Sequence, residues 1–354
     1  MISIRPFAQT DNEALLKVEK LCPQGDSKCA WGVAKKGDIS ARYKMYDNWK
    51  MSVAEDDGKI AGWIGWTIKE DPRRDNRYAY IAEVMVHPNS RRKGVASKLV
   101  SEAESDVKDR GADHVYCFLY ESNHASKSLF QNLGYAEKAL LWNCALMVHK
   151  KSRISHKYSI ENPGRDDLQE VAQLINNYNK SKAHFSPFTA ESFEEYVSNI
   201  PAYGLDNFWV VRHGDVIVAC AGIWDCTYFG DLYYAREPAT MRFMGRIVSV
   251  LGHLINLPKF PKEGEFINLR MMTSYSVDSA YPDAMQDLIA FLNNKLLEVR
   301  ANCLLHVVSP PDKSFEVARK MKPQIEKWSV YAKALNNSLE DLSPFYMDVR
   351  DLIL

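Results

Sequence analysis

Hydrophobic and polar positions alternate along the first 150 residues in a way that separates short strands from amphipathic helices. Asp11 precedes a helix whose apolar residues recur at helical spacing, and Asp56-Asp57-Gly58-Lys59 gives a strong hairpin turn. Residues 23–48, rich in Lys, Gly and aromatic side chains, are predicted as a loop or short helix. The pattern predicts further helices at 95–110 and 125–133, and strands at 2–6, 51–55, 60–68, 78–86, 115–120 and 138–148.

The same order of elements returns after the polar, basic stretch 149–157, which we interpret as an interdomain linker. Helices are predicted at 166–176, 282–300 and 314–321, and strands at 158–161, 208–212, 216–224, 266–275, 303–308 and 328–334. We therefore predict two α/β domains, at 1–150 and 156–354, each a twisted mixed sheet flanked by helices. An unrelated α/β domain in the second half is the alternative, and the extra segment 239–257 receives no assignment.

The composition argues against nucleic acid, a membrane or a metal ion as a partner of this chain. The 354 residues include 45 basic and 45 acidic side chains, so no overall charge attracts nucleic acid or an anionic membrane. The apolar stretch 243–257 is too short to span a bilayer and carries Arg246 and His253. The seven cysteines form no Cys-x-x-Cys pair, and Cys22 and Cys29 have no neighbouring His. We expect a cytoplasmic protein with reduced thiols and no metal site.

The segment from Val84 to Leu99 carries the clearest chemistry. An apolar strand runs into the basic, glycine-containing turn Arg91-Arg92-Lys93-Gly94 and then directly into a helix. Such a helix start directs backbone N–H groups and the positive end of the helix dipole toward one point. Gly94 lets an anion approach the backbone closely. The sequence therefore predicts a site for a phosphate or pyrophosphate.

The spacing Arg91-x-x-Gly94-x-Ala96 resembles the acetyl-CoA pyrophosphate loop of the GCN5-related N-acetyltransferase (GNAT) superfamily. Residues 80–88 look like the fourth strand of that family. Residues 123–135, which read Asn-x-x-Ser-x-x-Leu-Phe-x-x-x-Gly-Tyr, are close to its second signature. Two signatures in the right order and at the right distance imply an acetyl-CoA-dependent N-acetyltransferase.

The resemblance also assigns residues to the cofactor. Backbone groups of Val84, Met85 and Val86 would pair with the pantetheine arm, and one N–H would polarise the thioester carbonyl. Further cofactor contacts are implied for Asn123, Ser126 and Phe130 along the pantetheine, and for Arg91, Arg92, Lys93, Gly94, Val95, Ala96 and Ser97 around the pyrophosphate.

The proton-transfer residues depart from the family pattern. The usual base position falls on Ala82, so the adjacent Glu83 is the candidate, provided that a bulge turns it toward the face of Tyr80. Tyr80 and a water chain are the alternatives. The usual acid, a tyrosine, falls on Phe130, which leaves Tyr135, Tyr120, Ser126 or bulk water to protonate the leaving thiolate.

In the second half, superposing the helix ends Gly111 and Arg300 carries Gly94 onto Asp283 and Asn123 onto Asp312. Proline in Tyr281-Pro282-Asp283 removes a donor, and the aspartate repels a pyrophosphate. We therefore predict that 156–354 is a degenerate GNAT-like domain without a pyrophosphate loop.

The acceptor is expected to be an amine of a small molecule or a peptide. Its candidate pocket residues are Trp31, Tyr43, Tyr46 and Trp49, with Asp26, Asp38 and Asp47 for a cationic amine. Two other interpretations stay open: a catalytically weak CoA-binding regulatory or scaffold protein, and acyl transfer to a hydroxyl or thiol. The oligomeric state, monomer or homodimer, is undecided.

Overall fold

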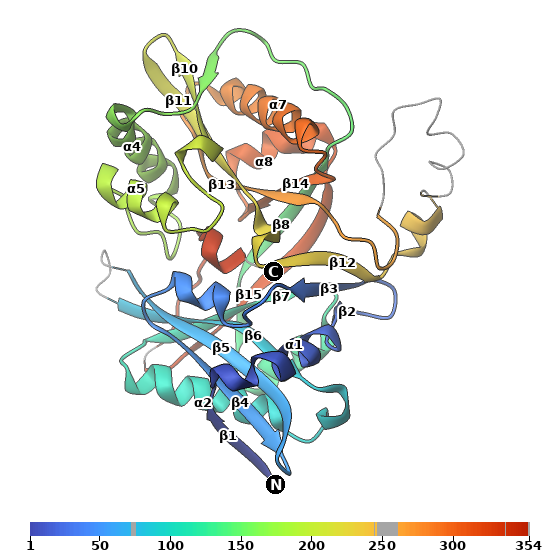
Figure 1. The fold of residues 1–354 in the computed structure, drawn as a ribbon. Coiled ribbons are helices and arrows are strands. Elements are labelled where there is room, and N and C mark those ends of the chain that lie inside the picture. Colours follow the sequence, from blue (N-terminus) through green and yellow to red (C-terminus); the bar gives the residue numbers. More distant parts are fainter. Residues whose placement is uncertain (72–75, 244, 246–260, 337, 353–354) are drawn as a thin grey trace. The chain divides into compact units, whose positions relative to one another are not determined.

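The computed structural model describes residues 1–71, 76–243, 245, 261–336 and 338–352 (Figure 1). The chain forms two compact units. Unit 1 consists of Met1–Leu140, Phe229–Arg236 and Trp328–Leu342. Unit 2 consists of Leu141–Tyr228, Glu237–Lys327 and Ser343–Leu354. Each unit is a mixed sheet with helices on its faces, which confirms the predicted fold class.

Unit 1 is built on a sheet with the strand order β1-β4-β5-β6-β7-β15. All neighbouring strands are antiparallel except the parallel pair β6 and β7. The strands are β1 (Ile2–Pro6), β4 (Trp49–Asp56), β5 (Lys59–Asp71), β6 (Asn76–Val86), β7 (His114–Tyr120) and β15 (Gln324–Ala334). The helices are α1 (Asn12–Lys20), α2 (Val95–Asp109) and α3 (His124–Asn132).

Unit 2 repeats this pattern of strand directions. Its sheet has the order β9-β10-β11-β13-β14-β8, and again only one pair, β13 with β14, is parallel. The strands are β9 (Ser159–Glu161), β10 (Phe208–His213), β11 (Val216–Trp224), β13 (Leu269–Val277), β14 (Cys303–Val308) and β8 (Ala136–Met147). The helices are α4 (Leu168–Asn179), α5 (Ala190–Ser198), α7 (Pro282–Glu298) and α8 (Lys313–Ala318).

The sequence pattern predicts that 138–148 completes the first domain and that 328–334 completes the second. In the structure the two strands are exchanged between the sheets. Trp328–Ala334 of β15 pairs with Tyr120–His114 of β7 in unit 1, although the sequence pattern assigned this segment to the second half. Trp142–Met147 of β8 pairs with β14 in unit 2. The prediction for these two strands was wrong because the pattern of apolar residues shows that a strand forms and does not show which strand it joins.

Two local predictions were also incomplete. The stretch 23–48 contains β2 (Gln24–Gly25) and β3 (Ala30–Lys35), and β3 pairs with β12 (Gly230–Arg236) in a separate three-stranded sheet of unit 1. Most of the unassigned segment 239–257 lies outside the described residues.

The two faces of the unit 1 sheet have separate cores. One core packs α2 and α3 against the strands through residues such as Leu99, Val107 and Phe130. The other packs α1 and the turn 41–45 against the opposite face through Leu15, Tyr43 and Met85. Among the described residues, no helix combines the length and the apolar composition needed to cross a membrane.

Candidate active site

The parallel strands β6 and β7 of unit 1 separate at the place where the sequence predicts cofactor binding. Their pairing covers Tyr78–His114, Ala79–Val115 and Tyr80–Tyr116, whereas β6 continues to Val86. Along this continuation β6 remains paired with β5, from Ile81 to Val86. One edge of Val84, Met85 and Val86 is therefore directed toward the gap between β6 and β7.

The turn after β6 delivers the chain to the start of α2. Arg92 and Gly94 both adopt the left-handed backbone conformation, with φ of 65° and 78°, and Gly94 is the N-cap of α2. A Cβ placed on Gly94 would meet no atom within 4 Å, so the space in front of this residue is open. The first N–H groups of α2, from Val95 to Ser97, have no partner within their own helix. This geometry fits the predicted anion site.

Side chains of the turn are fixed by their neighbours. Nε of Arg91 donates a hydrogen bond to the carbonyl oxygen of Val86 at 3.2 Å, which ties the basic turn to the end of β6. Nζ of Lys93 lies 2.9 Å from Oδ2 of Asp56. These contacts fix the side chains of Arg91 and Lys93 relative to the end of β6 and to Asp56.

The second predicted signature lies on α3. Oδ1 of Asn123 accepts a hydrogen bond from the backbone N–H of Ser126 at 3.1 Å and so caps this helix. Phe130 and Tyr135 are both 3% exposed, and their rings meet edge to face at 4.9 Å. Burial raises the pKa of the Tyr135 hydroxyl well above its ordinary value. The roles of all four residues stay predictions.

Glu83 occupies the bulge that the sequence analysis required. Glu83 pairs with Gly65 and Ile81 pairs with Trp66, so Ala82 is the extra residue of β6. The bulge brings the Glu83 side chain to the face of α1, where the buried Lys35 and Arg42 lie. Tyr80 lies close to Arg42 and Tyr43 on this face.

Three donors hold the carboxylate of Glu83. Nζ of Lys35 bonds Oε1, Nη1 of Arg42 lies 3.2 Å from the same oxygen, and the hydroxyl of Tyr43 donates to Oε2 at 2.8 Å. Tyr43 reaches this position across Gly65, since a Cβ there would lie 2.1 Å from the tyrosine hydroxyl oxygen. Burial disfavours the charged form of Glu83, but Lys35 and Arg42 outweigh it and lower the pKa. A carboxyl with a lowered pKa is a weak proton acceptor near neutral pH.

A second carboxylate, Glu19 on α1, belongs to the same buried group. It is 7% exposed, and among the described residues its Oε2 has no hydrogen-bond partner. Burial, the largest effect, raises its pKa to about 7, because Lys35 and Arg42 only partly offset it and Glu83 adds repulsion. Sequence reasoning missed Glu19 because a polar residue on an amphipathic helix is typical of a solvated face.

Several residues predicted to line the acceptor pocket instead pack in the core or bond to neighbouring residues. Tyr43 is fully buried, and the ring of Trp31 packs against that of Tyr234 at 4.0 Å. Oδ1 of Asp26 accepts hydrogen bonds from the N–H groups of its own loop, and Asp38 lies 2.6 Å from Nζ of Lys44. Of this set, Tyr43 bonds Glu83 directly. The ring of Trp49 stacks on that of Tyr43 at 6.0 Å, and Tyr46 lies close to Arg42.

In unit 2, the position that corresponds to Gly94 is closed to an anion. Asp283 lies 2.7 Å from Nζ of Lys157 and accepts a hydrogen bond from the Tyr158 hydroxyl at 2.7 Å. Strands β13 and β14 also separate, since their pairing ends at Met272–His306 while β13 continues to Val277. Here the Tyr275 hydroxyl donates to the carbonyl oxygen of Val307 at 3.0 Å and bridges the gap.

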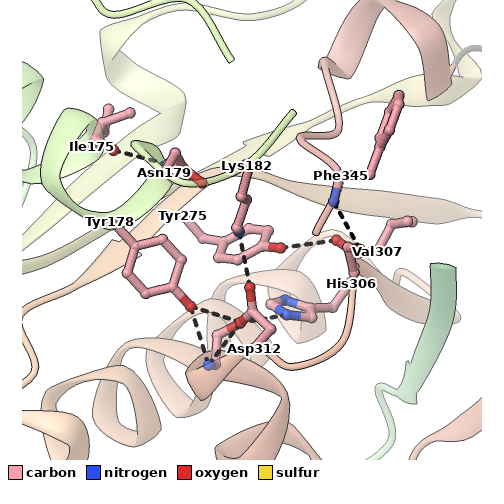
Figure 2. Close-up of polar contacts among 11 residues, drawn as sticks. Ile175, Tyr178, Asn179, Lys182, Tyr275, His306, Val307, Asp312 and Phe345 are labelled. Atoms are coloured by element: carbon pink, nitrogen blue, oxygen red, sulfur yellow. Dashed lines mark hydrogen bonds and ion pairs between the residues drawn. The ribbon is translucent and has the colours of Figure 1, made fainter. Parts of the chain in front are cut away.

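A buried polar cluster lies behind this gap in unit 2 (Figure 2). Asp312 caps α8 and accepts from Nζ of Lys182 at 2.9 Å and from the Tyr178 hydroxyl at 2.6 Å. Nε2 of His306 lies 2.9 Å from Oγ of Ser314, and burial lowers the pKa of this imidazole to about 4. A cleft of about 430 Å³ opens beside the cluster, lined by Tyr178, Lys182, Asp278, Asp312, Lys313 and Pro344 among others.

The comparisons with known proteins agree with the geometry of unit 1. The model of the acetyltransferase (GNAT) family matches residues 25–135, which include the bulged strand, the Gly94 turn and both signatures. Residues 25–135 therefore form a GNAT-family domain. An acetyltransferase of Pectobacterium atrosepticum is 29% identical over 134 residues, 38% of this chain and 87% of that protein. A chloroplastic GNAT protein of Arabidopsis thaliana is 32% identical over 60 residues, 17% of this chain and 21% of that protein.

Solved structures of 11–13% sequence identity share the fold over nearly the whole chain. A GNAT protein of Sphaerobacter thermophilus has a TM-score of 0.63 at 13% identity and covers 96% of this chain and 97% of its own. A tandem GNAT protein of the clavulanic acid pathway has a TM-score of 0.59 at 11% identity, with coverage of 96% and 100%. The Saccharomyces cerevisiae N-myristoyltransferase with bound myristoyl-CoA has a TM-score of 0.62 at 12% identity, with coverage of 96% and 84%.

The match of residues 25–135 to the GNAT model supports acyl transfer from a CoA-type donor as the class of activity. At the usual base and acid positions of GNAT enzymes this chain has Ala82 and Phe130. In the structure Ala82 is the extra residue of the bulge, and Phe130 is buried in the core. Any proton transfer in the reaction therefore depends on groups other than those two positions.

Proposed function

We propose that the protein transfers an acetyl group from acetyl-CoA to an amine of a small molecule or a peptide. The observation that carries this proposal is the separation of β6 from β7 after Tyr80, with the Gly94 turn and the start of α2 directly beyond it. Open space in front of Gly94 and the N–H groups of Val95, Ala96 and Ser97 fit a pyrophosphate.

The residues of unit 1 would divide the work of the reaction. Arg91, Arg92 and Lys93 would add positive charge around the pyrophosphate. The edge of β6 from Val84 to Val86 would align the pantetheine arm, and one backbone N–H would stabilise the charge that develops on the carbonyl oxygen. Bound acetyl-CoA supplies the activated acyl group. The buried Glu83 and its neighbours would lie on the acceptor side.

The alternative of a catalytically weak CoA-binding protein is supported by the two residues nearest to the usual acid position. Phe130 cannot donate a proton, and the Tyr135 hydroxyl is buried with a raised pKa. A thiol leaving group has a pKa of roughly 8.5, so transfer without a dedicated acid is slower and still feasible. We retain catalysis as the proposal and use turnover to decide between the two.

The proposal is tested by the release of free thiol from acetyl-CoA in single-turnover experiments with a panel of amines, with mass spectrometry of the products. We expect thiol release that depends on an amine, together with an N-acetylated product. Binding of acetyl-CoA without release for any amine would favour the non-catalytic alternative. An ester or thioester product would instead favour a hydroxyl or thiol acceptor.

We expect one CoA per chain in calorimetric titration. Unit 1 offers the Gly94 turn, whereas in unit 2 the corresponding Asp283 is paired with Lys157, and Tyr275 bridges the strand gap. A stoichiometry of two would contradict the prediction that the second unit is degenerate. An Asp283→Gly variant that still binds one CoA would show that Asp283 is not the sole obstacle in the second unit, where Pro282 and the Tyr275 bridge remain.

We also propose that the protein is cytoplasmic. None of the seven cysteines, all of which the structure describes, forms a disulfide, and this supports a reducing compartment such as the cytoplasm.

A further inference from the structure

We propose that Glu19 on α1 takes the proton from the acceptor ammonium, while Glu83 stays a paired anion that positions the site. This inference rests on the proposed function and identifies the titrating group of its acceptor side. It replaces Glu83, which the sequence favoured as the base, with a residue that no motif marks.

The first support is the distribution of hydrogen-bond donors. Oε1 of Glu83 takes Nζ of Lys35 and Nη1 of Arg42, and Oε2 takes the hydroxyl of Tyr43. The side chains of Lys35, Arg42 and Glu83 are all 4–5% exposed. Protonating Glu83 would leave two buried cations with one fewer negative charge beside them, which is costly in a poorly solvated site.

The second support is the unsatisfied carboxylate of Glu19. Its Oε2 is buried without a partner among the described residues, and the indole Nε1 of Trp63 on β5 is buried in the same condition. Buried polar atoms are nearly always paired in native proteins. An oxygen left open beside a cation-rich cluster is suited to a donor that arrives with the substrate, and an ammonium N–H is such a donor.

The third support is the position of α1 along β6. Sγ of Cys22, one helical turn after Glu19, donates to the carbonyl oxygen of Val86 at 3.3 Å. Glu19 itself interacts electrostatically with Glu83, three residues before Val86 on the same strand. Glu19 therefore lies beside the length of β6 along which the thioester would be held.

The charged groups around Glu19 set its titration. Burial, the largest effect, and the charge of Glu83 raise its pKa, Lys35 and Arg42 lower it, and the net pKa is about 7. When the surroundings of two neighbouring carboxyl groups give them different pKa values, one group commonly exchanges protons and the other stays charged. Glu83 is then ionised throughout the neutral range, while Glu19 is available as a base above about pH 7.

The proposed step balances as follows. Glu19 accepts one proton from the ammonium, and the free amine attacks the thioester carbon, forming the C–N bond. Collapse breaks the C–S bond and releases the thiolate, which takes up the second amine proton through water. Glu19 then returns its proton to solvent, so the net products are the amide, the free thiol and one proton.

The test compares kcat/KM of the wild type with that of Glu19→Gln between pH 5.5 and 9. Because both enzymes use the same acceptor, their ratio cancels the acceptor's own ionisation. We expect a ratio near one well below pH 7, where Glu19 is protonated, and a plateau of roughly 100-fold or more above it. Glu13→Gln, on the exposed face of the same helix, serves as the matched control and should stay near one at every pH.

Carboxyl ¹³C NMR of the wild type provides an independent arm, also valid if Glu19→Gln fails to fold. We expect a titration midpoint near 7 that disappears in the variant. A midpoint near the ordinary glutamate value, or a ratio that does not change with pH, would overturn the role of Glu19 and leave the proposed function standing. A wild type inactive with every amine, despite a midpoint near 7, would instead overturn the proposed function.

Discussion

Replacing Lys182 with methionine is expected to lower the free energy of unfolding by about 3–5 kcal/mol, since removal of one partner leaves a buried charge uncompensated. Asp312 is 8% exposed, and burial raises its pKa, but Lys182 and the hydrogen bonds from Ser314 and Tyr178 bring that pKa down to about 2. A lowered carboxyl pKa stabilises the fold at neutral pH, and this stabilisation is lost as the pH falls toward 2. Urea denaturation at pH 7 measures the loss.

Lys313→Met is the matched control for this substitution. Lys313 is adjacent to Asp312 and lines the same cleft, but its side chain is exposed, so the change should stay within about 0.5 kcal/mol. Similar losses in the two variants would contradict the argument that the buried pair with Asp312 carries the effect. A Lys182→Met variant as stable as the wild type would do so directly.

The cofactor side of the site was predictable because its signals are local. The strand Asn76–Val86, the left-handed glycine at position 94 and the helix Val95–Asp109 follow one another within a single stretch of the chain. A basic turn between an apolar strand and an amphipathic helix predicts the same backbone geometry wherever it occurs. The bulge at Ala82 was anticipated only as the condition under which Glu83 could face Tyr80.

The acceptor side was not predictable, because its partners meet through pairings distant in sequence. Lys35 lies on β3, which pairs with β12 nearly 200 residues later, as in the pair Gly230–Lys35. Nothing local to 23–48 indicates that strand, so this stretch looked like a loop. Glu19 interacts with Lys35, Arg42 and Glu83, which come from three other parts of the chain. The hydrophobic periodicity of the sequence does not indicate this meeting.

The internal repeat is clearer in the structure than in the sequence. Tyr43 crosses Gly65 to reach Glu83, and Tyr203 crosses Gly222, where its hydroxyl accepts from Oγ1 of Thr273 at 2.7 Å. In both units the strand pair beneath carries a bulge at this place.

Unit 2 thus keeps the tyrosine–glycine contact of unit 1 and replaces the carboxylate of Glu83 with the neutral Thr273. Together with Asp283 in place of Gly94, this change supports a second unit that kept the fold and lost the groups that the proposed reaction needs.

Replacing Gly94 with aspartate is expected to weaken acetyl-CoA binding by roughly 100-fold, about 2.7 kcal/mol. The new carboxylate would face the pyrophosphate at the start of α2 and repel it, and its side chain would fill the open space in front of residue 94. Calorimetry with acetyl-CoA measures the loss. Gly214→Asp is the matched control, because Gly214 has a φ of 62°, open space around it and a place in a hairpin turn of unit 2. Equal affinities in Gly94→Asp and wild type would remove the pyrophosphate site, and with it the proposed function.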